Sequence, residues 1–128
     1  MVKGIEIREA YFPGRPSLSA YGNGGFRFAN TSHRGSILCL PSGVYSWQPK
    51  GPVPFLSDIG RILAEANDIE ILLVGTGREL YLLPENVHKV LHAHHIAANS
   101  MNTGAAVRTF NVLLGEERAI AAALLAVE

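Results

Sequence analysis

The chain has 128 residues, with eleven basic and eleven acidic side chains, 48% hydrophobic residues and one cysteine. This length suits one domain spanning residues 1–128, and the apolar content excludes an intrinsically disordered chain, which would lack the side chains that offset ordering entropy. The balanced charge provides no positive field to attract phosphate backbones, so we expect no nucleic-acid partner.

The sequence also lacks the usual marks of membrane insertion and export. No apolar run approaches the roughly 20 residues that span a bilayer, and the first ten residues have neither an apolar signal core nor an Arg-rich transit pattern. We therefore expect an unprocessed bacterial cytoplasmic protein without a transmembrane segment, with peripheral action at the inner membrane left open. Cys39, inside the apolar run 37–40, is interpreted as a buried small hydrophobe.

The first third of the chain alternates turn formers with short β-type stretches. Residues 5–7 predict one short strand. Residues 18–21 and 25–28, joined across Gly22-Asn23-Gly24, predict a β-hairpin.

From Ser36 onward, apolar runs alternate with amphipathic segments, a pattern typical of βα units. Residues 36–40 and 70–74 predict the clearest strands, and residues 95–99 a weaker one. The Gly- and Pro-rich run 43–54 predicts a loop.

Three helices are expected between and after these strands. The second begins near Pro84, and the third is capped by Asn102 or Thr103 and ends near Gly115. Apolar residues three and four apart give each helix one face to pack on the sheet. These residues are Leu56, Ile59, Ile62, Leu63 and Ala66 in the first helix, Val87, Val90 and Leu91 in the second, and Ala106, Val107, Phe110, Leu113 and Leu114 in the third.

Residues 118–127 leave two interpretations open. The run Ala-Ile-Ala-Ala-Ala-Leu-Leu-Ala-Val has high helix propensity. An apolar run after a Gly-Glu-Glu turn also suits a buried strand, which would cover an otherwise exposed sheet edge.

Four segments together resemble the widespread Mth-type domain family: Ala-Tyr-Gly-Asn-Gly-Gly-Phe-Arg at 20–27, Val-Gly-Thr-Gly at 74–77, Leu-Pro at 83–84 and Met-Asn-Thr-Gly-Ala-Ala-Val-Arg-Thr-Phe-Asn-Val-Leu at 101–113. Eukaryotic members of the family include the mitochondrial complex I alpha subcomplex assembly factor 3 and the adipogenesis-associated Mth-domain protein. The resemblance covers about residues 18 to 127.

The resemblance implies an α/β three-layer fold, with short N-terminal antiparallel strands followed by βαβαβαβ and a mainly parallel, mixed sheet flanked by helices. It also implies that residues 118–127 form a strand. It implies no known reaction, and its functional hint is complex I assembly through protein contacts. Many relatives carry cysteine where this chain has Val107, so a thiol-based role cannot operate there, and packing is the simpler explanation of Val107.

The residues alone suggest one candidate site. Loops at the carboxyl ends of parallel strands share an edge, where free N–H groups at a helix start, with Thr76, Thr103, Arg78 and Arg108, could hold an anion. The alternative is that the glycines only make tight turns and the polar residues only cap helices. The candidate ligand or partner residues are Ser42, Gly75, Thr76, Gly77, Asn102, Thr103, Gly104, Arg108 and Asn111.

Other chemistries have weaker support. The sequence lacks the spaced glycines of a dinucleotide fingerprint and the P-loop lysine. His88, His92 and His95 lack both the glutamate of a His-Glu-x-x-His site and a further ligand, and Ser42 lacks the pattern of a nucleophile elbow. We therefore predict no catalytic residue, cofactor or metal.

These observations predict a non-catalytic protein that supports assembly of a respiratory or membrane complex, with respiratory-complex subunits as candidate protein partners. Tyr45 and Trp47, on the expected Pro-rich loop, would either anchor a partner or fold back on the core. The alternative function is a small-molecule or anion-binding protein, or an enzyme, that uses the 75–77 and 102–108 edge.

Overall fold

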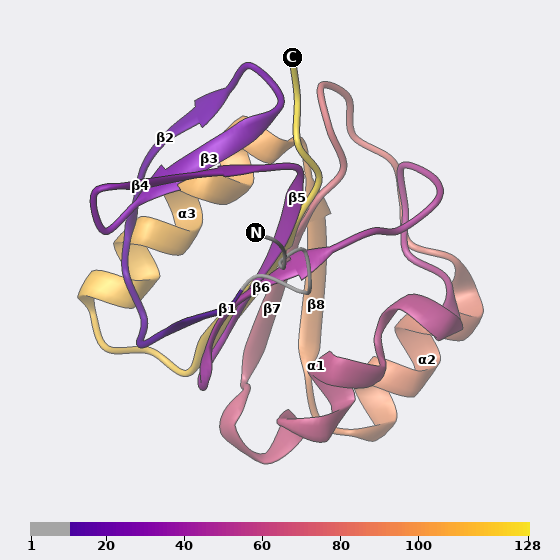
Figure 1. The fold of residues 1–128 in the computed structure, drawn as a ribbon. Coiled ribbons are helices and arrows are strands. Elements are labelled where there is room, and N and C mark those ends of the chain that lie inside the picture. The colour runs from indigo at the N-terminus through magenta and orange to yellow at the C-terminus, as the bar shows by residue number, and fades with distance from the viewer. Residues whose placement is uncertain (1–10) are drawn as a thin grey trace.

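The computed structural model describes residues 11–128, which form a six-stranded sheet, a three-stranded sheet and three α-helices (Figure 1). The larger sheet has the order β1-β6-β5-β9-β7-β8, and the smaller has the order β2-β3-β4. The strands are β1 (Tyr11–Pro13), β2 (Leu18–Gly22), β3 (Gly25–Phe28), β4 (Thr31–Arg34), β5 (Ser36–Leu40), β6 (Gly43–Trp47), β7 (Ile71–Gly75), β8 (Ala97–Met101) and β9 (Ile120–Leu124). The helices are α1 (Gly60–Ala64), α2 (Glu85–Ala93) and α3 (Thr103–Gly115).

The predicted hairpin is confirmed. β2 and β3 pair antiparallel with Gly22 opposite Gly25, and the two residues between them, Asn23 and Gly24, have φ of 53° and 81°. Positive φ at both central residues is the geometry of a type I′ turn, whose twist matches that of the flanking strands. The sequence of the turn therefore sets the register of the hairpin. The expected strand at residues 5–7 lies outside the described residues.

The larger sheet is mixed, as expected, because β7 pairs parallel with both β8 and β9 whereas β5 pairs antiparallel with β9 and β6. The prediction of a loop over residues 43–54 is wrong for its first part. Residues 43–47 form β6, which folds back on β5 with Leu40 opposite Gly43. Val44 packs in the core under α3, whereas Tyr45 and Trp47 pack in the core under α1 and α2, and this alternation between two cores was the missed strand signal.

The first predicted helix is shorter than its apolar spacing suggested. Residues 56–68 form a one-turn 3₁₀ helix (Leu56–Asp58), α1, and a second 3₁₀ turn (Ala66–Asp68). Ile59 and Ile62 are fully buried, but Leu56 is 45% exposed, so its place on the packing face was wrong. Gly60, an unfavourable helix residue, lies at the start of α1, between the first 3₁₀ turn and the rest of α1.

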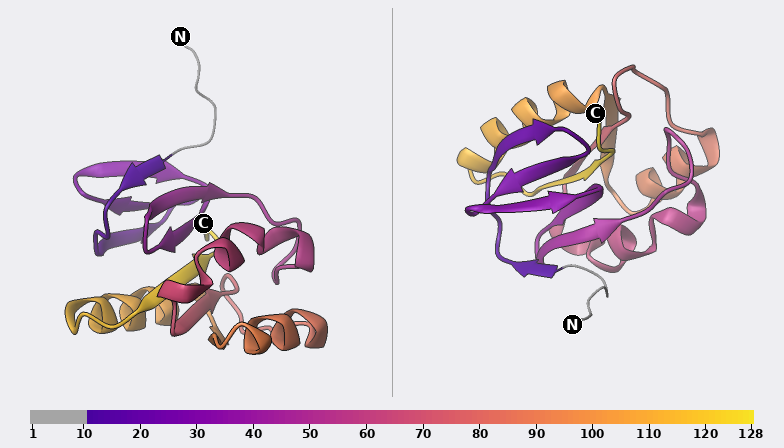
Figure 2. Two further views of the ribbon diagram at one scale, coloured as in Figure 1. Left: turned by 90° about the horizontal axis from the view of Figure 1, so that it is seen from below. Right: turned by 45° about the horizontal axis from the view of Figure 1, so that its top comes forward.

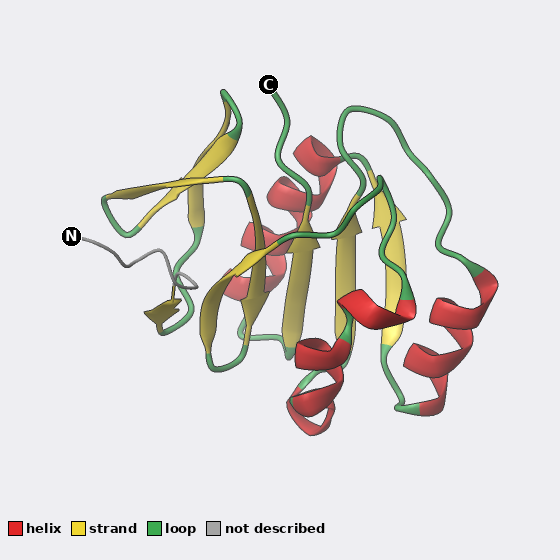
Figure 3. Cartoon of the chain, turned by 45° about the vertical axis from the view of Figure 1, so that its right-hand side comes forward, coloured by secondary structure: helices red, strands yellow, loops and turns green. Residues whose placement is uncertain are grey.

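The other two helices follow the predictions closely. α2 starts directly after Pro84 and buries Val87 and Leu91, while α3 starts after Asn102, whose side chain accepts a hydrogen bond from the Ala105 N–H. α1 and α2 cover one face of the larger sheet and α3 covers the other (Figure 3). The strand expected at residues 95–99 is present, two residues later, as β8.

Residues 118–127 contain a strand, which confirms what the resemblance implied. All five residues of β9 are buried, and they lie between β5 and β7 in the middle of the sheet. Its side chains alternate between two cores, with Ile120, Ala122 and Leu124 on the α3 side. Ala121 and Ala123 belong to the core under α1 and α2.

The smaller sheet closes the α3 side of the molecule, away from α1 and α2 (Figure 2). Leu18, Phe26 and Phe28 pack in one cluster with Ala106, Val107 and Phe110 of α3 and with Cys39 of β5. Val107 is 5% exposed, which confirms its interpretation as a packing residue. Cys39 is 3% exposed, and burial raises the pKa of its thiol to about 12, as expected for an unreactive core cysteine.

Trp47 packs against the core under α1 and α2, and its indole N–H donates to the Asp58 carbonyl at 3.0 Å. The interpretation that Trp47 folds back on the core is therefore confirmed, and the alternative of an exposed partner anchor is wrong for this residue. Tyr45 is half-buried, and the Arg61 guanidinium lies 4.4 Å from its ring centroid.

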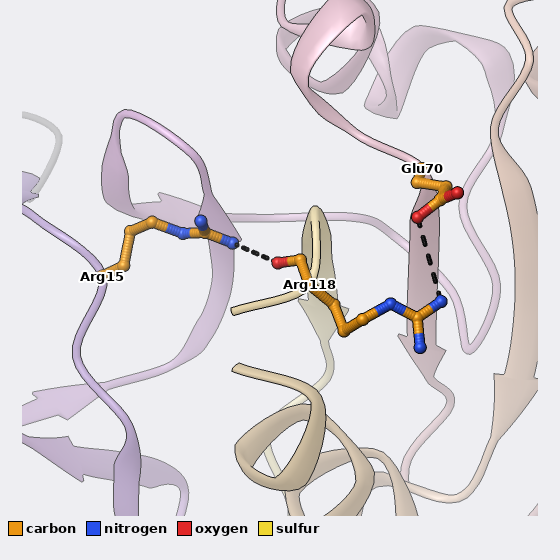
Figure 4. A network of polar contacts seen from close by, with 3 residues as sticks. All are labelled: Arg15, Glu70 and Arg118. Atoms are coloured by element: carbon orange, nitrogen blue, oxygen red, sulfur yellow. Dashed lines mark hydrogen bonds and ion pairs between the residues drawn. The ribbon is translucent and has the colours of Figure 1, made fainter. Parts of the chain in front are cut away.

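Polar contacts join segments at the amino ends of β7 and β9 (Figure 4). Arg15 donates to the carbonyls of Arg118 at 3.3 Å and Ile120 at 2.9 Å. The Arg118 side chain reaches Glu70 at 3.8 Å, but both side chains are exposed, so this ion pair contributes at most about 1 kcal/mol. The segments at this end of the sheet are therefore held together mainly by hydrogen bonds from Arg15 to backbone carbonyls.

His33 on β4 generates a pH prediction. Its Nε2 is buried with no partner among the described residues, and desolvation lowers its pKa, with an opposing contribution from a backbone hydrogen bond with Ser36. The unfolded chain then binds the proton more readily, so the free energy of unfolding should fall as pH drops below the ordinary His pKa of 6.5. Urea titrations from about pH 8 to about pH 5 should show this decline, with a smaller decline in His33→Gln. An identical decline in both proteins would contradict it.

Candidate functional site

The carboxyl ends of the three parallel strands meet at one edge of the larger sheet. Gly75 is in register with Met101 of β8 and with Leu124 of β9, so the segments that follow these strands lie side by side. This arrangement brings together most of the candidate residues, namely Gly75, Thr76, Gly77, Asn102, Thr103, Gly104 and Arg108. We call this region the carboxyl edge.

Ser42 does not belong to it. Because β5 runs antiparallel to β9, the turn after Leu40 lies at the opposite end of the sheet. The Ser42 N–H donates to Glu65 at 2.9 Å, its hydroxyl donates to the same carboxylate at 2.5 Å, and the hydroxyl also contacts the Tyr45 hydroxyl. The expectation that Ser42 joins the other loops is therefore wrong, because it assumed that β5 runs parallel to its neighbours.

The two threonines at the edge are buried and hydrogen-bonded within the protein. Thr103 is fully buried, and its hydroxyl donates to the Leu125 carbonyl at 2.8 Å and accepts from the Gly77 N–H at 2.9 Å. Thr76 is 2% exposed, and its hydroxyl donates to the Glu79 carbonyl at 2.6 Å and accepts from the Tyr81 N–H. These hydroxyls hold the loops in shape and are not directed at a ligand.

Backbone groups at the start of α3 are engaged in the same way. The Thr103 N–H donates to the Gly77 carbonyl at 2.8 Å, and the Ala105 N–H donates to Asn102 Oδ1 at 2.8 Å. The predicted alternative, in which Asn102 caps the helix, is thus what the structure shows. These two N–H groups are not available to hold an anion.

Gly75 allows this close contact between strand and helix. A Cβ at Gly75 would lie 3.1 Å from Thr103 Cα and 3.0 Å from Leu124 Cδ2, tighter than ordinary packing. A larger residue would push α3 away from β7.

An open pocket of about 520 Å³ remains on the outer side of the carboxyl edge. Arg78 and Arg108 supply its positive charge, and Glu128 brings a carboxylate. Arg78 Nη2 donates to the Glu128 carbonyl at 3.3 Å. The lining residues are Tyr21, Gly77, Arg78, Asn102, Gly104, Arg108, Val127 and Glu128.

The sequence did not indicate the contributions of Tyr21 and residues 125–128 to this pocket. Residues 125–127 extend past β9 along the edge, with the Leu125 N–H donating to Gly75, the Ala126 N–H to Ser36 Oγ, and the Val127 carbonyl accepting from Gly24. These contacts join residues that are far apart in the sequence. No local sequence pattern indicates them, so they could be recognised only from the fold.

Asn111 lies on α3 but serves a structural contact. Its Oδ1 accepts from the Leu18 N–H and its Nδ2 donates to the Leu18 carbonyl, both at 2.8 Å. The amide thereby pairs with β2 as a neighbouring strand would, and it fastens the smaller sheet to α3. Asn111 does not line the pocket of the carboxyl edge.

The segment between β7 and α2 exposes three consecutive large apolar side chains, which we call the apolar loop. Leu80 is 57% exposed, Tyr81 45% and Leu82 79%. Phe55 and Leu56, before α1, are also exposed, at 52% and 45%. Consecutive exposed apolar side chains are typical of interaction surfaces, whereas single ones are common everywhere.

No three His, Cys, Asp or Glu residues within 11–128 are arranged to hold a metal ion. His88 and His92 are both exposed on α2. No helix in the described part of the chain is long and apolar enough to cross a membrane.

Residues 18–125 match the family described as protein of unknown function (DUF498/DUF598). The chain belongs to this family. A further family relationship is indicated by the NADH dehydrogenase [ubiquinone] 1 alpha subcomplex assembly factor 3 of Xenopus tropicalis, which is 28% identical over 109 residues. That match covers 84% of this chain but only 60% of the assembly factor.

Solved structures share the fold of this family member. A crystal structure from Bartonella henselae, described as an outer membrane protein, is 60% identical, with a TM-score of 0.89 over 91% of this chain and 99% of that chain. A solution structure from Bordetella pertussis, described as a Mth938-like domain, is 28% identical, with a TM-score of 0.70 over 88% of this chain and 86% of that chain. The Mth-type fold implied by the sequence motifs is thus confirmed.

Thr103 provides a direct test of the structural interpretation of the carboxyl edge. Thr103→Val keeps the side-chain shape but leaves the Gly77 N–H and the Leu125 carbonyl without their partner, so the free energy of unfolding should fall by about 1–3 kcal/mol. Chemical denaturation would measure the loss. Thr109→Val, in the same helix and with no hydrogen bond from its hydroxyl to another residue of 11–128, is the control and should change stability little. Equal losses in the two variants would contradict the assignment.

Proposed function

We propose that this protein supports the assembly of a respiratory or membrane complex through protein contacts, without catalysing a reaction. The observation that carries the proposal is its similarity to the complex I assembly factor, 28% identical over 84% of this chain. The match spans 60% of that protein, so it supports a role for the shared domain only. Subunits of a respiratory complex are the proposed partners, and the proposed location is the cytoplasm or the inner face of the membrane.

The apolar loop is the proposed contact surface. Hydrogen bonds fix the backbone of this loop on both sides of Leu80, because the Thr76 hydroxyl donates to the Glu79 carbonyl and accepts from the Tyr81 N–H. A loop whose backbone is already fixed loses less conformational entropy when a partner binds. Leu82, at 79% exposed, has the most apolar surface to lose to a partner.

Replacing Leu82 with serine should separate binding from folding, because the side chain makes little contact within the protein. Affinity capture of the tagged protein from its native cells in mild detergent should recover respiratory-complex subunits with the wild-type chain and lose most of them with Leu82→Ser. Val112→Ser on α3, where the side chain is 60% exposed, is the matched control and should keep them. Mass spectrometry would quantify the subunits. A wild-type chain that recovers none, together with normal complex I assembly after gene deletion, would contradict the proposed role.

The alternative function is the binding of a small molecule or anion at the carboxyl edge, as a binding protein or an enzyme. It is favoured by the placement of Arg78 and Arg108 around one pocket with Asn102 and Gly104. Arg108 makes no hydrogen bond or ion pair with another described residue, so its guanidinium is available to a ligand. The Glu128 carboxylate in the same pocket opposes an anion.

Arg108→Ala tests this alternative with inorganic phosphate as the probe. Loss of a charge-assisted hydrogen bond should weaken phosphate affinity by about tenfold or more, measured by NMR titration, while the fold is unchanged. Arg27→Ala is the control, because Arg27 is exposed on β3, bonds to Ser32 and does not line this pocket. Equal phosphate affinity in the wild type and in Arg108→Ala would exclude the site.

A further inference from the structure

One face of the smaller sheet is exposed and carries positive charge. Phe26 and Phe28 of β3 pack in the core against α3, so the alternation of a strand turns Arg27, between them, to the opposite side. Ser32 of β4 lies opposite Arg27 in the register and shares this side. Arg27 and Ser32 are both exposed. We call this side of β2, β3 and β4 the outer face.

An open pocket of about 470 Å³ lies on the outer face. Arg27 and Arg34 are the charged side chains of this pocket, and no carboxylate of residues 11–128 lines it. The pocket of the carboxyl edge, by contrast, has Glu128 beside its arginines. In a chain with equal numbers of acidic and basic residues, the outer face is therefore a local excess of positive charge. The lining residues are Ala20, Tyr21, Gly22, Asn23, Gly25, Phe26, Arg27, Ser32, His33 and Arg34.

Both guanidinium groups have donors to spare. Arg27 Nη1 donates to Ser32 Oγ at 2.8 Å, which holds the side chain over the sheet. Arg34 makes no hydrogen bond or ion pair with another described residue. Its Nη1 and the Glu128 carboxylate both lie close to Gly24, yet the two groups form no ion pair. Each arginine can therefore bind a carboxylate from another molecule.

The floor of the pocket is made of small residues. A Cβ at Gly25 would overlap the His33 carbonyl oxygen, so only glycine fits at this position. Gly22 and Ala20 continue the floor on β2. The backbone of another polypeptide can therefore come close to the sheet between the two arginines.

The outer face is unsuited to nucleic acid and to an apolar partner. Tyr21 lies in register with Phe26, whose ring is buried against α3, so both aromatic side chains belong to the opposite side of the sheet. Single-stranded nucleic acid needs aromatic rings for stacking, and an apolar partner needs exposed apolar side chains. The outer face offers charge instead, and its complement is a partner that carries carboxylates.

The positions of the two arginines match an extended acidic chain. Arg34 is two residues beyond Ser32, which lies opposite Arg27, and such diagonal positions in a sheet are about 7–8 Å apart. Alternate residues of an extended chain lie on one side, about 7 Å apart. A segment with acidic residues at alternate positions can therefore direct one carboxylate to each guanidinium.

We propose that the outer face binds an extended acidic segment of a protein partner, with carboxylates at alternate positions paired with Arg27 and Arg34. An exposed ion pair changes a binding constant by only about fivefold or less, so a small anion gains little here. Two carboxylates on one chain bind in a single association event, which favours a polypeptide. The inference rests on the proposed function in taking the occupant to be a protein partner, but it uses a different surface from the apolar loop.

Two acetylated and amidated peptides, Ser-Glu-Thr-Glu-Ser and Ser-Gln-Thr-Gln-Ser, are the matched probes. In NMR titrations of the whole chain, the Glu peptide should shift the amides of Gly22, Gly25 and Ser32, and the Gln peptide should bind at least about fivefold more weakly. Arg34→Ala should weaken binding of the Glu peptide by about three- to fivefold, because one of the two ion pairs is lost.

Charge reversal gives a test with a positive outcome. The double variant Arg27→Glu, Arg34→Glu should lose the Glu peptide and bind Ser-Lys-Thr-Lys-Ser at the same amides, because the sign of the face is reversed. Both arginines are exposed, so the fold should be unchanged. The double variant Lys50→Glu, Lys89→Glu alters net charge equally at exposed lysines outside the pocket, and it should bind the Glu peptide as the wild type does.

Equal affinity of the wild type for the Glu and Gln peptides would overturn the proposal, as would binding of the Glu peptide that survives charge reversal. Tighter binding of inorganic phosphate or of an oligonucleotide at the same amides would also overturn it, because the occupant would then belong to another class. Affinity capture separates this inference from the proposed function. If respiratory-complex subunits are recovered but the Glu peptide is not bound, only the outer-face inference fails, whereas the reverse result contradicts only the proposed function.

Discussion

The position of β9 in the middle of the larger sheet is the constraint on which the rest of the structure depends. On one side β9 pairs antiparallel with β5, and on the other it pairs parallel with β7, so it joins the hairpin half of the sheet to the βα half. All five of its side chains are buried, and they contribute to both cores. A helix in this place would leave β5 and β7 with unpaired buried backbone, which is why strand formation prevails over the helix propensity of the alanines.

The structure of the carboxyl edge depends on β9 and on the residues that follow it. The chain leaves β9 at this edge, and residues 125–127 make two backbone hydrogen bonds, with Gly75 and Gly24, and a third to the Ser36 hydroxyl. Thr103 links this segment to the Gly77 loop through one buried hydroxyl. The polar residues expected to bind a ligand at this edge therefore make hydrogen bonds that hold three strands and a helix together. The surface left for a ligand consists of arginine side chains and the open pocket between them.

Local patterns predicted the hairpin, α2, α3 and the main strands, because turn chemistry, capping and periodicity act over a few residues. The sequence motifs also led to the correct family fold. The failures have a common cause in relations between distant segments. Ser42 was misplaced because strand direction depends on pairing partners, and Asn111 was assigned to a site because nothing near it in sequence indicates its bonds to Leu18. The places of Tyr21 and Glu128 in the pocket were not predicted, for the same reason.

The groups that have no partner within the described residues are better suited to contacts with another protein than to binding a small ligand. Buried donors at the carboxyl edge have partners, whereas the apolar loop exposes Leu80, Tyr81 and Leu82, and β8, the outer strand of the larger sheet within residues 11–128, has one side that no described strand covers. Anions are recognised by free donors and concentrated positive charge, but apolar side chains and strand edges are recognised by other polypeptides.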